Sequence, residues 1–497
     1  MRLPFIVFIS GGTVMVVELL GARIIAPYLG STIYVWTSVI GVILGALSLG
    51  YFLGGRLADW RPSWRLFAGA LFASGVAIFL LAVTKNEILA FIPRFGWRAG
   101  AVIGALLLFT LPSALLGLVA PFAVRLRLKD VATSGHVIGN LYAISTVGSI
   151  TGTFLTGFVL VPMFSTTMTL YGLALTQAAL SFFAWPYLSR CRLRISALTF
   201  MVLWSALAAW ESSTADRRRN ILVRTETPYS QILVFDGYWR DDDRPSRQLK
   251  QDAHASSAEY LDDTGEIVVY DYVRMYRLDK IFNAEIKNAL LIGGGAYTTA
   301  FDFLRRWPGA AMSVVEIDPE LTAVAYQYFH IKPTDRLTTS HQDARVFLND
   351  NRQKFDAVYG DAYRDTNSIP WHLTTNEAMS KIADSLNHNG VFLLNVISAL
   401  DGPKAGFLHS QVKTLSLYFP QVYVFATKPD KWQTQNLMVV AVKSDRRLTV
   451  EEMLAKSGDD NRPFIAKLAG DFTPAADAFT LTDDYAPVEF LAAKSLP

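Results

Sequence analysis

The sequence predicts two kinds of domain in one chain, a helical membrane domain followed by a soluble α/β domain. Apolar residues make up 51% of the 497 residues and charged residues only 18%, a composition too apolar for a wholly soluble protein. The excess lies in residues 1–212, whereas the remainder has an ordinary soluble composition. We therefore expect a transmembrane domain at 1–212, a small β-rich domain at 220–284 and an α/β domain at 285–497.

The first region contains a succession of apolar stretches that could cross a bilayer, which takes about 20 helical residues each. They lie at 4–27, 33–55, 65–84, 99–124, 136–162, 166–188 and, shorter than the rest, 194–211. Closely spaced glycines in the second and fifth stretches predict tight helix packing inside the bundle. Glu18 and Arg23 fall within the first stretch. Since charge is costly at membrane depth, we expect Glu18 to pair with Arg23 or Arg56, either in a polar site or as a structural lock.

Charge and cysteine content exclude several classes of function. The net charge is +3 and no basic stripe is present, so nucleic acid is not an expected partner. The single cysteine, Cys191, excludes an internal disulfide and a cysteine-rich metal site. The seven histidines form no ligand pattern, and the sequence therefore predicts no metal.

The soluble half begins with short strands and continues as alternating strands and helices. Stretches 221–225, 231–235 and 267–272 predict a small antiparallel β unit. From residue 289 onward, strand and helix patterns alternate, which predicts a mainly parallel, Rossmann-like sheet with right-handed crossovers. In such sheets, ligands bind beyond the carboxyl ends of the strands.

Glycines and acidic residues stand at those predicted strand ends. The strand at 289–293 runs into Gly293, Gly294 and Gly295, where glycine lets the backbone approach a ligand closely. Glu316 ends the next strand about twenty residues later, a spacing typical of an acid that holds the hydroxyls of a ribose. Asp343 and Asp361 fall at further strand ends, and together these residues predict a nucleoside site.

Several motifs occur in the order and spacing of the spermidine synthases. They are Tyr229-Ser230-Gln231, Gly293-Gly294-Gly295, Val315-Glu316-Ile317-Asp318, Asp343-Ala344 and the stretch 355–362. Stretches 18–30, 54–59, 369–375 and 481–489 are similar to the membrane-fused branch of that family. The chain therefore resembles a polyamine aminopropyltransferase of methyltransferase-type fold with an N-terminal transporter-like domain, over nearly its whole length.

The resemblance implies a nucleoside site with defined contacts. Gln231 would contact the thioadenosine part of the donor, and Glu316 would accept hydrogen bonds from both ribose hydroxyls. Asp343 would bind the adenine amino group, with Ala344 beside the ring. The donor would be S-adenosylmethionine or its decarboxylated form, and no metal is needed because a sulfonium is already an activated leaving group.

The resemblance also implies the residues that carry the chemistry. Asp361 and Tyr229 would be catalytic, with Asp361 positioning and deprotonating the attacking amine. Tyr363 and His372 are expected contacts of a small-molecule amine acceptor.

Three positions depart from the family pattern. Ala296 stands where an aspartate usually meets the donor's amine, Tyr272-Val273-Arg274 replaces Tyr-His-Glu, and the proline-containing loop is replaced at 362–367. A guanidinium matches a carboxylate. Arg274 is therefore a candidate anchor for S-adenosylmethionine itself, and a solvated charge is the alternative interpretation.

Other reaction classes remain open at this point. The donor's own amine could attack in a cyclisation or lysis, the fold could transfer a methyl group, or the soluble half could bind a nucleoside as a non-catalytic transporter or sensor. A homodimer is also open, because soluble relatives are commonly oligomeric.

Arginine and lysine cluster after the second, fourth and sixth stretches, which places these loops and the N-terminus in the cytoplasm. Seven spans would put the soluble half outside, whereas Arg217, Arg218 and Arg219 favour the inside. Stretch 194–211 could instead lie along the surface or re-enter. We expect a multi-pass protein of the inner or cell membrane with a cytoplasmic soluble half, mainly because the nucleoside donor is made there.

Overall fold

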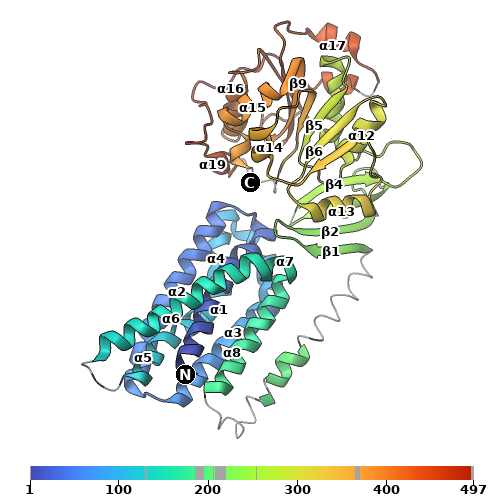
Figure 1. Cartoon of the computed structure of the whole chain (residues 1–497). Coiled ribbons are helices and arrows are strands. Elements are labelled where there is room, and N and C mark those ends of the chain that lie inside the picture. Colours follow the sequence, from blue (N-terminus) through green and yellow to red (C-terminus); the bar gives the residue numbers. More distant parts are fainter. Residues whose placement is uncertain are drawn as a thin grey trace. The chain divides into compact units, whose positions relative to one another are not determined.

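The computed structural model describes residues 2–128, 130, 133–184, 195, 196, 198–204, 206, 220–252, 254–363, 370–459 and 461–493. The chain divides into two units (Figure 1). The first comprises Met1–Arg219 with Thr225–Gln231, and the second comprises Asn220–Arg224 with Ile232–Pro497. Cys191, Arg217, Arg218 and Arg219 lie outside the described residues, as do eight of the eighteen residues of the predicted stretch 194–211.

The first unit is helical. Its described residues contain six helical segments long and apolar enough to cross a membrane, and they match the first six predicted stretches. These are α1 (Arg2–Leu29), α2 (Ile33–Trp60), α3 (Trp64–Phe91), α4 with α5 (Trp97–Gly117 and Val119–Arg127), α6 extended by η3 and α7 (Ser134–Leu155, Thr156–Leu160 and Val161–Met163), and α8 (Thr166–Ala184).

Some of the closely spaced glycines make the predicted helix contacts and others do not. A Cβ atom at Gly50 would collide with the backbone of Ala114 on α4, and one at Gly148 would collide with the backbone of Phe8 on α1. Gly41 and Gly139, on the same two helices, face open space. Glycine spacing therefore identified helices that pack closely, but not which face of each helix does so.

Glu18 and Arg23 on α1 do not form the expected pair. Arg23 donates to the backbone carbonyl oxygens of Thr227 at 2.6 Å and Pro228 at 2.8 Å, within the first unit. In the part of the chain that the structure describes, Glu18 makes no ion pair with Arg23 or Arg56. The guanidinium of Arg23 binds a turn about two hundred residues away, which no local pattern predicts.

A four-stranded sheet in the order β1-β2-β3-β4 begins the second unit, except that the end of β1 and the first residue of β2 belong to the first unit. Its strands are β1 (Ile221–Glu226), β2 (Gln231–Tyr238), β3 (Pro245–Gln251) and β4 (His254–Tyr260). The predicted strand at 267–272 is wrong, because this stretch forms only one bridge, from Val268 to Glu259, and then enters helix α10 (Asp271–Met275). The β3–β4 hairpin supplies the strands that complete the sheet.

The larger sheet has seven strands in the order β10-β11-β9-β8-β5-β6-β7. They are β5 (Asn288–Ile292), β6 (Ala311–Val315), β7 (Leu337–Ser340), β8 (Phe355–Gly360), β9 (Leu386–Ser398), β10 (Gln421–Ala426) and β11 (Gln435–Val442). Strands β7, β6, β5, β8 and β9 are parallel, whereas β11 pairs antiparallel with both β9 and β10. The expected Rossmann-like α/β fold is confirmed.

Helices cover both faces of this sheet (Figure 1). Phe303 of α12 (Thr298–Arg306) and Val324 of α13 (Pro319–Tyr328) belong to the apolar core on one face. The other face is covered by α14 (Ala344–Asp350), α15 (Asn376–Ser385) and α16 (Gly406–Leu415), whose side chains join a second apolar core. Because both faces are buried, the ends of the strands remain as the place for a polar site.

Candidate active site

The glycine turn after β5 is held against the end of β8. Gly293 has φ +91°, and a Cβ atom there would lie 2.6 Å from the backbone carbonyl oxygen of Asp361. Both the left-handed conformation and this close approach require glycine. The turn therefore brings the backbone of the predicted nucleoside site next to the residue predicted to be its base.

Glu316 follows β6 and is bound by the same turn. The residue is 6% exposed, and its carboxylate accepts hydrogen bonds from Gly294 N at 2.8 Å and Asp318 N at 2.9 Å. Burial raises the pKa of Glu316, and the two amide donors oppose that rise. The structure thus places Glu316 at the glycine turn in a fixed orientation, as a ribose-binding acid requires.

Asp343 follows β7 and caps α14. One oxygen accepts from the backbone N–H of Arg345 at 2.7 Å, and the other lies 3.1 Å from Nε2 of His372. Ala344 is buried beside it. Arg345 in turn donates to the backbone oxygen of His372 at 3.0 Å and contacts Asp483 at 2.6 Å. The two predicted residues Asp343 and His372 are therefore direct neighbours, which their separation in sequence did not indicate.

Asp361 follows β8 directly and has hydrogen-bond donors around it. Nδ2 of Asn395 on β9 donates to its carboxylate at 3.0 Å. The hydroxyl of Tyr272 on α10 lies near this carboxylate, whose pKa it lowers, and lies 3.5 Å from the backbone oxygen of Ser256. Burial raises the pKa of Asp361 to about 6, against the lowering effect of these two donors. A carboxyl group with this pKa is largely ionised at neutral pH and can accept a proton there.

Two further tyrosines enclose Asp361. The hydroxyl of Tyr276 donates to the backbone oxygen of Gly360 at 2.8 Å. The hydroxyl of Tyr363 donates to the backbone oxygen of Asn395 at 2.7 Å and accepts from Ile397 N at 3.2 Å. Tyr363, predicted as a substrate contact, is thus a wall residue that fastens the segment after β8 to β9.

The structure adds residues that the sequence did not single out as functional. Tyr272 stands in the altered Tyr-His-Glu position, and that motif was the only signal for it. Asn395 and Asn436 gave no signal, because their proximity depends on the insertion of β11 between β9 and β10. Sequence spacing carries no information about that strand order.

Arg274 contacts residues of its own segment. Its Nε and Nη2 atoms donate to the backbone oxygen of Val268 at 3.1 and 2.8 Å, and Nη1 contacts Asp271 at 3.4 Å. The guanidinium therefore stabilises the segment from Val268 to Arg274. Tyr229 and Gln231 belong to the first unit, so the structure does not place them relative to the glycine turn. Of the altered loop, residues 364–369 lie outside the described residues.

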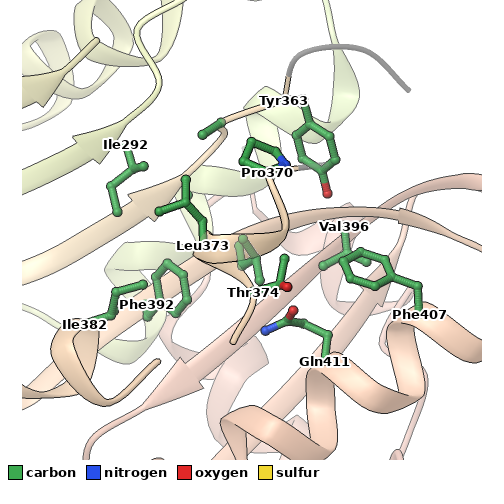
Figure 2. A pocket seen from close by; sticks show the side chains of 13 residues that line it. Ile292, Tyr363, Pro370, Leu373, Thr374, Ile382, Phe392, Val396, Phe407 and Gln411 are labelled. Atoms are coloured by element: carbon green, nitrogen blue, oxygen red, sulfur yellow. The ribbon is translucent and has the colours of Figure 1, made fainter. Parts of the chain in front are cut away.

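An apolar cavity lies beside the carboxyl ends of β5, β8 and β9 (Figure 2). Its side chains come from the sheet, from the segments around 362 and 373, and from α15 and α16. The lining residues are Ile292, Gly360, Ala362, Tyr363, Pro370, Leu373, Thr374, Ile382, Phe392, Leu394, Val396, Phe407 and Gln411. The site therefore has an apolar flank on one face of the sheet and polar groups around Asp361.

Known proteins resemble part of this chain in sequence. A model of the spermine/spermidine synthase domain matches residues 275–450. A polyamine aminopropyltransferase of Vibrio vulnificus is 25% identical over 302 residues, covering 59% of this chain and 98% of the relative. A probable polyamine aminopropyl transferase of Bifidobacterium longum is 29% identical over 221 residues, covering 41% of this chain and 48% of the relative.

The crystal structure of a probable spermidine synthase from Corynebacterium glutamicum aligns with 53% of this chain and 97% of its own, at 18% identity and a TM-score of 0.44. In the described residues no group of three or more potential metal ligands occurs. The C-terminal part of the chain is thus a spermidine synthase-like domain, which makes the protein an enzyme of the aminopropyltransferase type.

Proposed function

We propose that the protein is a membrane-embedded transferase that moves an aminopropyl-type group from a sulfonium nucleoside to a small amine and releases methylthioadenosine. The observation that carries this proposal is the contact between the glycine turn and Asp361. It puts a carboxylate that can accept a proton beside the backbone expected to hold the nucleoside. Glu316, fixed by Gly294, supports the same placement.

The reaction needs a neutral amine in line with the carbon attached to sulfur. The amine nitrogen forms a bond to this carbon, the carbon–sulfur bond breaks, and its electron pair stays on sulfur as a neutral thioether. Because an amine is protonated at neutral pH, the carboxylate of Asp361 takes a proton from it before the attack, and the product leaves as an ammonium. Tyr272 and Asn395 hold that carboxylate, so its remaining lone pairs are available to the amine.

Decarboxylated S-adenosylmethionine is the donor that the relationship to aminopropyltransferases favours. S-adenosylmethionine would need a partner for its carboxylate. Arg274 was the candidate for this role, but its donors bind Val268 and Asp271. We therefore propose the decarboxylated form, and a preference for S-adenosylmethionine in direct binding measurements would contradict this part of the proposal.

The decisive experiment identifies the nucleoside product. Full-length protein in detergent is incubated with either donor, with and without putrescine. Methylthioadenosine that depends on putrescine supports aminopropyl transfer, and methylthioadenosine without it indicates cyclisation or lysis. S-adenosylhomocysteine would instead establish methyl transfer. Nucleoside binding without any product would overturn the enzymatic proposal in favour of a transporter or sensor.

Asp361→Asn is the matched variant for this experiment. Asparagine has nearly the same shape but cannot accept the amine's proton as a carboxylate does. We expect turnover to fall by roughly 100-fold or more, since general-base catalysis contributes at least that much. Nucleoside affinity should stay close to that of the wild type, because the turn and Glu316 are unchanged.

A further inference from the structure

Two asparagines link Asp361 to the inserted strand β11. Nδ2 of Asn436 donates to Oδ1 of Asn395 at 3.0 Å, and Nδ2 of Asn395 donates to Oδ1 of Asp361 at 3.0 Å. Asn436 pairs with Ile397 in the β9–β11 register, and Asn395 pairs with Met438. The two asparagines therefore lie diagonally across neighbouring strands, in a row that ends at the carboxylate.

The direction of the hydrogen bonds in this row follows from which atoms can donate and which can only accept. An ionised carboxylate only accepts hydrogen bonds, so Asn395 must turn its NH₂ group toward Asp361. Its carbonyl oxygen then points the other way and needs a donor, because Asn395 is only 2% exposed. Asn436 supplies that donor. The orientation of one amide thus depends on the other.

Burial and the neighbouring hydrogen-bond donors act in opposite directions on the charge of Asp361. Tyr272 faces it from α10, Tyr276 from the short helix Tyr276–Leu278, and Tyr363 from the segment after β8. These neighbours are hydroxyl groups, and Asn395 adds an amide. Burial raises the pKa of Asp361, and the bonds from Asn395 and Tyr272 are what lower it. Loss of one donor must therefore favour the protonated form.

We propose that Asn436 is a positioning residue for the transfer reaction: by fixing the amide of Asn395, it keeps Asp361 ionised and aimed at the attacking amine. This inference rests on the proposed function, in which Asp361 is the base. Asn436 acts through Asn395. Two strands, β9 and β8, separate β11 from the glycine turn after β5, so nucleoside binding does not depend on Asn436.

Removal of the donor has a specific consequence. Without Asn436, the amide of Asn395 can rotate and present its carbonyl oxygen to Asp361, which repels the carboxylate. The acid limb of the pH–rate profile should then move to higher pH by about one unit. Turnover should be about tenfold slower on the acid limb and about twofold slower at neutral pH, with recovery in more alkaline buffer. The KM for the nucleoside should remain unchanged.

The experiment compares three variants of the full-length protein. Asn436→Leu keeps the size of the side chain and removes the donor, and Asn436→Asp replaces the amide with a group that only accepts. Asn387→Leu is the control, because Asn387 lies on the same strand as Asn395 and donates to Asp356 at 2.7 Å, outside the site. We expect the first two to shift the acid limb and the control to leave it in place.

Two results would overturn the inference. One is a pH profile of Asn436→Leu that falls uniformly or matches that of Asn387→Leu, as for a merely structural residue. The other is a further loss when Asn436→Leu is added to Asp361→Asn, since a residue acting through Asp361 has no effect once that carboxylate is gone.

A second measurement keeps this inference separate from the proposed function. The protonation of Asp361 can be followed by infrared difference titration, with the carboxyl signal assigned by its loss in Asp361→Asn. This readout needs no turnover. An unchanged titration midpoint in Asn436→Leu would contradict the proposed effect of Asn436 on Asp361, whatever the reaction is. Absence of product from the wild type, with a shifted midpoint in the variant, would overturn the proposed reaction alone.

Discussion

Asp361 is under two opposing demands. It must be ionised to take a proton from an amine, yet its enclosure between strand ends and tyrosines favours the neutral acid. Tyr272 and Asn395 offset only part of that cost. A residue held in this way is expected to reduce the stability of the fold at the pH at which it works.

The stability of Asp361→Asn tests this expectation. The carboxyl group has a pKa of 3.8 in the ordinary reference state and about 6 in the fold. The folded state therefore binds more protons between these values, and stability falls as pH rises through this window. At pH 7.5 the variant should be more stable by roughly 1–3 kcal/mol. Thermal unfolding in detergent should show a higher Tm for the variant at pH 7.5, with the gain reduced near pH 4; a lower Tm at pH 7.5 would contradict this account.

Glu316 offers a second test at the residue scale. Both of its oxygens accept backbone N–H groups, from Gly294 and Asp318. In Glu316→Gln, one of these amides must face an NH₂ group, which disturbs the turn, and a ribose loses a charged acceptor. We expect binding of methylthioadenosine to weaken by about 10- to 100-fold in calorimetry. Glu320→Gln, in the first turn of α13, is the control and should bind as the wild type does.

The glycine turn is the element on which the site depends, and the sequence located it correctly. The order of strand, glycine turn and helix is local, so residue types and spacing predicted this turn and the position of Glu316 at the end of the next strand. Their role in binding stays a prediction. The strand predicted at 267–272 was wrong because an apolar run does not by itself distinguish a strand from a buried helical segment. Asn395 and Asn436 could not be found, because they meet only through the antiparallel insertion of β11.

A substitution in the turn tests whether position 293 requires glycine for its backbone conformation and for its close approach to Asp361. In Gly293→Ala, the added Cβ atom would meet the backbone of Asp361 at 2.6 Å, in a conformation that L residues avoid. We expect a stability loss of roughly 1–3 kcal/mol together with weaker nucleoside binding. Gly309→Ala is the matched control, because open space surrounds that glycine. Equal Tm values for the two variants would contradict the need for glycine at 293.

At the scale of the whole molecule, the chain joins a soluble enzyme fold to helices whose composition suits a bilayer. Large apolar side chains such as Leu107, Phe154 and Phe158 are exposed on these helices. Exposure of this kind is costly in water and favourable in hydrocarbon. We therefore propose a multi-pass membrane protein, with the soluble half on the cytoplasmic side where the nucleoside donor is made.

A single reporter cysteine tests the side on which the soluble half lies. Cys191→Ser removes the only cysteine of the chain, and Gln433→Cys then places one in an exposed segment between β10 and β11. A maleimide that cannot cross membranes should label this cysteine in inverted vesicles and leave it unlabelled in right-side-out vesicles. The opposite pattern would place the soluble half outside. Labelling of both preparations after detergent treatment is the control.

The position of β11 also has a consequence for biosynthesis. Strands β5 to β9 are complete by residue 398, yet β9 remains a bare edge until residues 421–442 have been made and β11 has paired with it. Ribosomes synthesise chains from the N-terminus onward, so the hydrogen bonds that link Asn436 through Asn395 to Asp361 are among the last parts to form. A translation product that ends before β11 would contain the glycine turn and Asp361 but would lack Asn436. The edge of β9 would be unpaired, and an exposed strand edge of this kind would be a target for quality control.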